Sequence, residues 1–92
     1  MFPTYSEIVK TNFTQIVSDY MFDQPSIPTE LKVHGRLSAI LEILFPDEVD
    51  VITVSLTKWA AIAIVPFKVD NSTLTIQCTI NFETLEVTAE AI

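Results

Sequence analysis

The second half of the chain alternates between apolar and polar residues. From about residue 73 to 82, leucine, isoleucine and cysteine alternate with threonine and glutamine, and the segments at about 50–57 and 85–91 follow the same pattern. A period of two residues is typical of a β-strand with one buried and one solvated face. The segment at about 59–69 is apolar on both faces, as in a strand at the centre of a sheet. The pattern therefore predicts four strands, at about 50–57, 59–69, 73–82 and 85–91.

The connections between these strands indicate which residues face inward. Asp70 and Asn71 read as a two-residue hairpin loop, which pairs an even-numbered position with an odd-numbered one. Short loops at 57–58 and 83–84 give the same parity, so we expect an antiparallel meander with one consistent inner face. That face is expected to hold Ile52, Val54 and Leu56, then Trp59, Ala61, Ala63, Val65, Phe67 and Val69, then Leu74, Ile76, Cys78, Ile80 and Phe82, and finally Leu85, Val87, Ala89 and Ala91.

A helix precedes the strands at the start of the chain. Thr4 and Glu7 have the spacing of a capping box, and apolar residues recur after them at helical intervals. This pattern predicts one amphipathic helix over about 4–22, which the proline-containing segment 23–28 ends. The expected buried stripe is Val9, Phe13, Ile16, Val17 and Tyr20.

A second helix is predicted over about 28–45. Gly35 weakens its first half, so an alternative stays open in which 31–34 form a short strand and the helix begins at Arg36 or later. The whole chain, 1–92, then forms a single α+β domain in which both helices pack on one face of the sheet. The expected buried stripe of the second helix is Val33, Leu37, Ile40, Leu41 and Leu44.

Length and cysteine content narrow the class of protein. A chain of 92 residues can bury enough surface for one domain, and a single cysteine excludes an intrachain disulfide. The first residues lack the basic and then apolar order of a signal peptide. The longest apolar stretch, 59–67, is much shorter than the roughly 20 residues of a membrane helix. We therefore expect a cytoplasmic protein with no membrane partner.

The charge balance bears on the kind of partner. Five lysines and arginines stand among twelve acidic residues, which gives a net charge of −7. Five basic residues are too few to neutralise a phosphate backbone, and we therefore expect no nucleic-acid ligand. The same acidity suits basic protein partners.

A polar stripe on the second helix is the first candidate for chemistry. Glu30, His34, Ser38 and Glu42 recur every four residues and would lie along one side of that helix. Glu30 and His34 could ligate a metal, but useful sites need three or four ligands. We therefore interpret the stripe as a solvated outer face and expect no metal.

Two other candidates are equally weak. Asp47, Glu48 and Asp50 cluster after Pro46, yet they lack the glycine and the ligand spacing of a calcium loop. Cys78 lies on the inner face of its strand, where a nucleophile has neither access nor a base. We expect no catalytic residue, no cofactor and no enzymatic activity.

One surface departs from an ordinary solvated sheet. Ile62 and Ile64 point outward at the centre of the face that two helices on the other side cannot cover. This face either meets a partner, most simply a second copy in a two-fold dimer, or is covered by a helix that crosses over, or tolerates β-branched residues for their strand propensity. The predicted interaction surface is Ala60, Ile62, Ile64 and Pro66, flanked by Thr53, Ser55, Thr75 and Thr79.

The sequence thus predicts a small acidic protein-interaction module that self-associates, acting as an adaptor, an assembly subunit or an inhibitor. The alternative is a small-ligand-binding domain with a pocket between helices and sheet. Its walls would be polar-tipped residues among Tyr5, Tyr20, Trp59 and His34.

Overall fold

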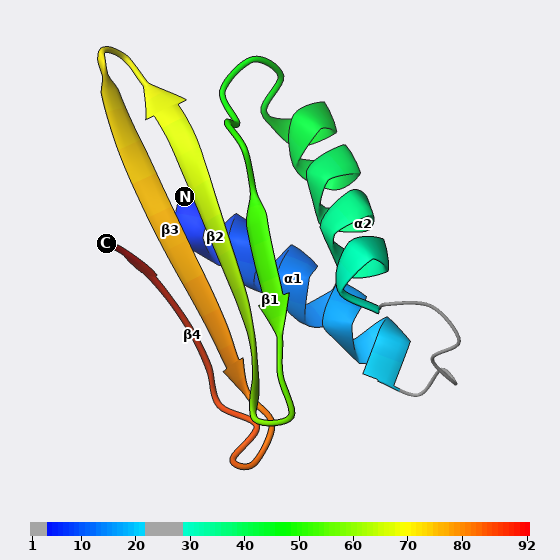
Figure 1. Ribbon diagram of the computed structural model, residues 1–92. Helices are drawn as coiled ribbons and strands as arrows, with labels where there is room; N and C mark the ends of the chain where they lie inside the picture. The colour runs from blue at the N-terminus through cyan, green and yellow to red at the C-terminus, as the bar shows by residue number, and fades with distance from the viewer. Residues whose placement is uncertain (1–3, 22–28) are drawn as a thin grey trace.

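Two helices precede four strands in the computed structural model, which describes residues 4–21 and 29–92. The strands pair antiparallel in the order β1-β2-β3-β4 (Figure 1). This α+β meander confirms the fold that the alternating pattern predicted. The elements are α1 (Tyr5–Met21), α2 (Thr29–Leu44), β1 (Thr53–Leu56), β2 (Ala60–Val69), β3 (Ser72–Asn81) and β4 (Val87–Ala91).

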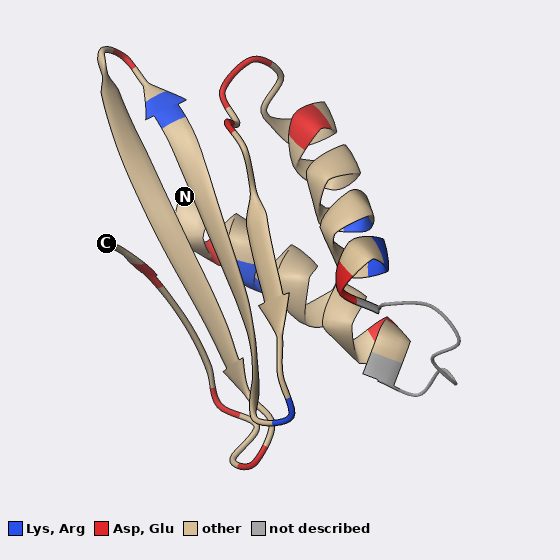
Figure 2. Ribbon diagram, in the orientation of Figure 1, with Lys and Arg blue, Asp and Glu red and all other residues tan. Residues whose placement is uncertain are grey.

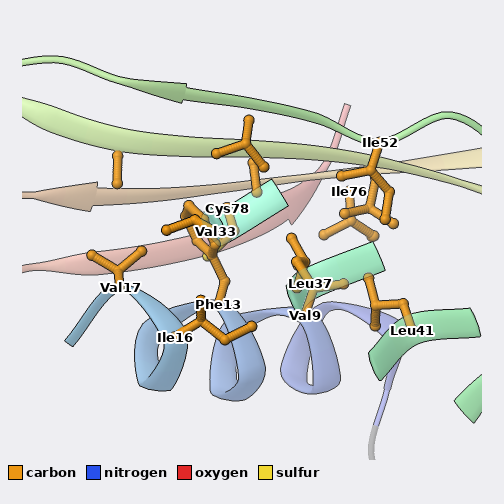
Figure 3. Packing of buried hydrophobic residues seen from close by; sticks show 14 of the residues in the cluster. Val9, Phe13, Ile16, Val17, Val33, Leu37, Leu41, Ile52, Ile76 and Cys78 are labelled. Atoms are coloured by element: carbon orange, nitrogen blue, oxygen red, sulfur yellow. The ribbon is translucent and has the colours of Figure 1, made fainter. Parts of the chain in front are cut away.

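Both helices pack on the same face of the sheet. Phe13 of α1 and Leu37 of α2 are fully buried, and Figure 3 shows Phe13 directed toward Val33 and Cys78, and Leu37 beside Val9, between the helices and the strands. Helix α1 contacts mainly β3 and β4, whereas α2 contacts β1. The buried apolar residues are Val9, Phe13, Ile16, Val17, Val33, Leu37, Leu41, Ile52, Val54, Ala61, Ala63, Val65, Phe67, Ile76, Cys78 and Ile80.

Helix α1 begins as the capping pattern predicted. The hydroxyl oxygen of Thr4 accepts a hydrogen bond from the backbone N–H of Glu7 at 3.3 Å, which satisfies one free donor of the first turn. The predicted stripe lies against the sheet, with Tyr20 partly buried. The predicted end at Phe22 and the interruption at 23–28 lie outside the described residues.

Helix α2 is continuous through residues 31–34, so the alternative with a short strand there is wrong. Leu44, predicted to be buried, is 51% exposed, and this prediction is also wrong. The buried side follows steps of four from Val33, and the next step after Leu41 falls on Phe45. The Phe45 ring therefore packs on the core where Leu44 was expected.

The hairpin between β2 and β3 has the predicted register. Val69 pairs with Ser72, which leaves Asp70 and Asn71 as the loop. Asp70 adopts a left-handed φ of 55°, a conformation that aspartate tolerates in turns.

The hairpin between β1 and β2 turns one residue later than predicted. Lys58 and Trp59 form the loop, because the N–H of Thr57 bonds to the carbonyl oxygen of Ala60 at 3.0 Å. The Thr57 hydroxyl oxygen also accepts hydrogen bonds from the N–H groups of Trp59 and Ala60, both at 3.1 Å. The parity of the strands is unchanged, but Trp59 is 70% exposed in the turn, so its predicted inward position is wrong.

The turn between β3 and β4 is longer than predicted, although Ile80 still pairs with Val87 in the predicted register. The side-chain oxygen of Asn81 accepts the N–H groups of Glu83 and Thr84 at 2.9 and 3.0 Å, which organises residues 82–85 as the loop. Leu85 has a φ of 63° and is 68% exposed there. The inward prediction for Leu85 is therefore wrong. Ala91 is exposed, but it pairs with the buried Ile76 and so lies on the predicted inner side of the sheet.

Strand β1 begins at Thr53, not at 50, and Pro66 explains the difference. The even-numbered residues of β2 bond toward β1, and proline has no N–H to offer there. Between the pairs Val49–Phe67 and Thr53–Ile64, the three residues 50–52 ahead of β1 therefore lie opposite only two residues of β2, 65 and 66. This extra residue is a bulge, which is where a strand proline is tolerated.

Candidate interaction surface

The outer face of the sheet lies on the side away from both helices. Within residues 4–21 and 29–92, no element covers it, so the alternative in which a helix crosses to this side is wrong (Figure 1). All eight residues predicted for the interaction surface lie on this face. Ala60, Ile62, Ile64 and Pro66 run along β2, with Thr53 and Ser55 beside them on β1 and Thr75 and Thr79 on β3.

The centre of this face is apolar and uncharged. Ile62 stands between Ser55 and Thr79, and Ile64 between Thr53 and Gln77. Figure 2 shows that charged residues lie toward the ends of β2 and along β4, away from this centre. A partner can therefore cover the centre of the face without desolvating a charge, which would cost several kcal/mol or more.

In the polar stripe of α2, Glu30 and Glu42 are exposed as predicted, but two of its residues also bond to the backbone beside the helix. The backbone N–H of Leu56 donates to a carboxylate oxygen of Glu30 at 3.0 Å. The ring Nε2 of His34 donates to the carbonyl oxygen of Ile52 at 2.9 Å. Glu30 and His34 therefore bind the free edge of β1. No group of three or more His, Cys, Asp or Glu among the described residues is placed to hold a metal ion.

The acidic residues after α2 accept hydrogen bonds within the chain or occupy a turn position. Glu48 accepts a hydrogen bond from the Tyr5 hydroxyl at 3.1 Å, and this bond, with burial, raises the pKa of Tyr5. Asp50 accepts the backbone N–H of Val51 at 2.9 Å. Asp47 holds a left-handed φ of 68° in the turn. Glu48 and Asp50 thus bond to separate partners within the chain.

Cys78 is fully buried, as predicted. Burial raises the pKa of its thiol from 9.0 to about 11, so the neutral form prevails at physiological pH. The thiolate is the nucleophile, and a neutral buried thiol is therefore inert.

The four residues proposed for a ligand pocket do not converge. The Tyr5 ring lies 4.6 Å from the Phe67 ring, in an aromatic cluster at one end of α1. Tyr20 lies near the other end of α1, next to the cationic groups of α2. His34 bonds to the edge of β1 and Trp59 is exposed in a turn. No shared wall results from these positions.

A groove that sequence reasoning missed runs between α1 and β4. It has a volume of about 570 Å³, and its walls include Lys10, Thr11 and Thr14 of α1 and Val87 of β4. Most of its wall residues are polar side chains of α1, which in the sequence resemble an ordinary solvated helix face.

Three comparisons with known proteins bear on this chain. The family described as "Domain of unknown function (DUF7355)" matches residues 1–92. A relative from Enterobacteria phage T4, "Uncharacterized 10.1 kDa protein in cd-pseT intergenic region", is 39% identical over 92 residues, which covers 100% of both chains. No solved structure matches the chain. In the parts that the structure describes, neither helix has the length and apolar character needed to cross a membrane.

Proposed function

The chain belongs to the DUF7355 family, and we propose that it is a small acidic protein-interaction module whose outer sheet face binds a second copy of itself. The supporting observation is the uncovered face centred on Ile62 and Ile64, which carries an uncharged apolar strip between hydroxyl-bearing strands. An apolar patch of this kind on a small domain is typical of an interface.

Charge favours self-association through this face over other surfaces. Each copy carries a net charge of −7, so two copies repel each other, and they repel least where the facing surfaces hold no charge. The central rows of the outer face on β1, β2 and β3 meet that condition, because their residues are Thr53, Ser55, Ile62, Ile64 and their neutral β3 partners. A sheet face packed on its own copy gives a closed two-fold dimer.

The face is large enough for a small interface. Strands β1, β2 and β3 have 4, 10 and 10 residues, and each residue covers roughly 3.3 by 4.8 Å of the sheet. Their projected area is therefore roughly 400 Å², about half of the roughly 800 Å² that each partner buries in a standard interface, which is the size of a weak dimer.

Binding rather than catalysis is the proposed activity, in the role of an adaptor, an assembly subunit or an inhibitor. The dimer would leave both helices and the β4 side of each copy accessible to further proteins. We place this activity in a reducing, cytoplasmic compartment, because the one cysteine is a buried free thiol.

The test introduces charge at the centre of the face. Ile62→Glu with Ile64→Glu should remain folded, because both side chains lie outside the helix-packed core. It should lose the dimer, since carboxylates would be desolvated without a counter-charge. Light scattering coupled to size exclusion measures the mass, and circular dichroism measures the fold.

A matched control adds the same two charges elsewhere. Leu31 and Ile43 are 69% and 79% exposed on α2, so Leu31→Glu with Ile43→Glu should remain dimeric. A monomeric wild type would contradict self-association, and equal dissociation of both variants would show that added charge, not the face, is responsible.

A further inference from the structure

The outer edge of β4 presents unpaired backbone groups. Glu86 and Ile92 bond toward β3, through the Asn81 N–H and the Thr75 carbonyl oxygen, both at 2.9 Å. Because bonding direction alternates along an antiparallel strand, Val87, Ala89 and Ala91 direct their N–H and C=O groups away from the sheet. Among the described residues, nothing bonds to these groups from that side. Figure 1 shows β4 at the edge opposite α2.

The groove between α1 and β4 adjoins this edge. Val87 belongs to both, because its backbone lies on the edge and its side chain lines the groove. A second hollow, of about 190 Å³, shares Thr14 and Val87 with the first and extends it to Leu85. A strand added to β4 would therefore point every second side chain into a continuous groove against α1.

One polar atom in the groove lacks a partner. The hydroxyl oxygen of Thr14 is buried and has no hydrogen-bond partner among the described residues, although Thr14 lines both hollows. Buried hydroxyls are nearly always bonded, so rotation of this side chain toward the groove would let it bond to a bound segment.

The charges around the edge select the partner. Glu86 and Glu90 are exposed on the outer side of β4, Glu83 is exposed in the preceding turn, and Glu7 lines the groove. Lys10 is the one basic residue on the described walls of the groove. Figure 2 shows acidic residues and no basic ones along β4 and its turn. A strand that lies beside β4 would place side chains directly opposite Glu86 and Glu90, where basic residues are attractive and acidic ones repulsive.

We propose that β4 and α1 form a binding groove for an extended basic segment of a partner protein, which adds to the sheet as a fifth strand. Backbone hydrogen bonds to Val87, Ala89 and Ala91 would supply affinity, and alternate side chains would supply specificity. A second copy of the chain is a poor occupant, because pairing β4 with itself would bring the glutamates of both copies together. Glu86 and Glu90 stand at the β4 margin of the outer face, whereas Ile62 and Ile64, at the centre of the proposed dimer interface, are not part of this site.

The test uses a synthetic peptide that mirrors the edge. In the probe Val-Lys-Val-Thr-Val-Lys-Val, the lysines stand four residues apart, like Glu86 and Glu90. The control peptide has glutamate in place of both lysines. The lysine peptide should bind about tenfold tighter than the control and should shift the NMR signals of the Val87, Ala89 and Ala91 amides most.

Two variants separate the contribution of backbone hydrogen bonds from that of charge. Ala89→Pro removes an outward N–H without removing a bond to β3, so it should stay folded by circular dichroism and lose about tenfold or more in peptide affinity. Glu90→Lys should lose about tenfold, whereas Glu42→Lys, with the same charge change on α2, should bind normally. If Ala89→Pro fails to fold, the Glu90→Lys and Glu42→Lys pair still decides the question.

The dimer variant keeps the two proposals apart, because Ile62→Glu with Ile64→Glu should bind the peptide as the wild type does. Three results would overturn the proposal. They are NMR shifts confined to residues away from β4, equal affinity for the lysine and glutamate peptides, and no binding of the lysine peptide. Self-pairing that Ala89→Pro abolishes would also overturn it, because the occupant would then be a second copy.

Discussion

The two edges of the sheet differ in whether their outward-pointing backbone groups have hydrogen-bond partners. At β1, Glu30 and His34 of α2 bond to the backbone groups of Leu56 and Ile52 that point away from the sheet. At β4, the equivalent groups of the described chain have no such partners. An uncovered edge strand invites pairing with another chain, and natural proteins usually blunt it. One edge of this sheet is thus closed by the chain's own helix, and we infer that the other serves binding.

The largest expected difference between the two sides comes from packing. Leu37 of α2 is fully buried, so Leu37→Ala should destabilise the protein by about 2–5 kcal/mol. Val87 of β4 is only partly buried beside the groove, so Val87→Ala should cost about 1 kcal/mol. Urea unfolding of both variants measures the free energies, and equal losses would mean that the β4 side is packed as closely as the α2 side.

The hydrogen bonds that close β1 give the next effect. Glu30→Ala with His34→Ala should lose about 1–3 kcal/mol, because two backbone groups of the edge lose their partners. The Leu56 amide should then exchange with deuterium faster, while the Val87 and Ala89 amides, already unpaired, should not change.

Ser38 and Glu42 provide the control for that experiment, since they lie on the same stripe of α2 and line a groove against residues 49–52, ahead of β1. Ser38→Ala with Glu42→Ala should stay within about 0.5 kcal/mol of the wild type. A loss as large as that of the Glu30 and His34 variant would mean that the stripe acts through its general polarity.

The smallest effect concerns the stiffness of α2. A side chain added at Gly35 would meet nothing within 4 Å, and the residue is exposed in the middle of the helix. Gly35→Ala should therefore stabilise the protein by about 0.5–1 kcal/mol. Thermal unfolding measures the gain. If the β4 amides exchange with deuterium at an unchanged rate, the added stability is confined to α2 and the β1 edge. Slower exchange of the β4 amides would show that the two edges are coupled.

Much of the fold could be predicted from period and parity alone. Because side chains alternate strictly along a strand, the hairpin at Asp70 and Asn71 was enough to orient β2, whose own pattern is apolar on both faces. The capping pair Thr4 and Glu7 located the start of α1 for a similarly local reason.

The errors arose where one residue acts on another strand or turn. Trp59 was misplaced because the Thr57 hydroxyl binds two N–H groups and moves the turn by one residue. The first strand was drawn too long because Pro66, on the neighbouring strand, has no N–H to extend the ladder. Neither effect leaves a trace in the alternation of apolar and polar residues.

The predicted interaction surface was assembled correctly as a face, because parity fixes which residues share a side. The closure of β1 by Glu30 and His34 could not be predicted, since it depends on how α2 lies against the sheet. The groove at β4 was missed for the same reason. A groove beside a helix depends on how α1 lies against β4, which the pattern of apolar and polar residues does not fix.

The contact of α1 with β3 and β4 has a consequence for the order of folding. Each strand pairs with the one before it, so the hairpins need only short loops to close and should form early. Helix α1 is made first on the ribosome, yet the strands it packs against are made last. During synthesis the part of its apolar stripe that packs on β3 and β4 must therefore stay exposed until about seventy further residues have emerged, with only α2 to contact before then, and such exposure favours chaperone binding.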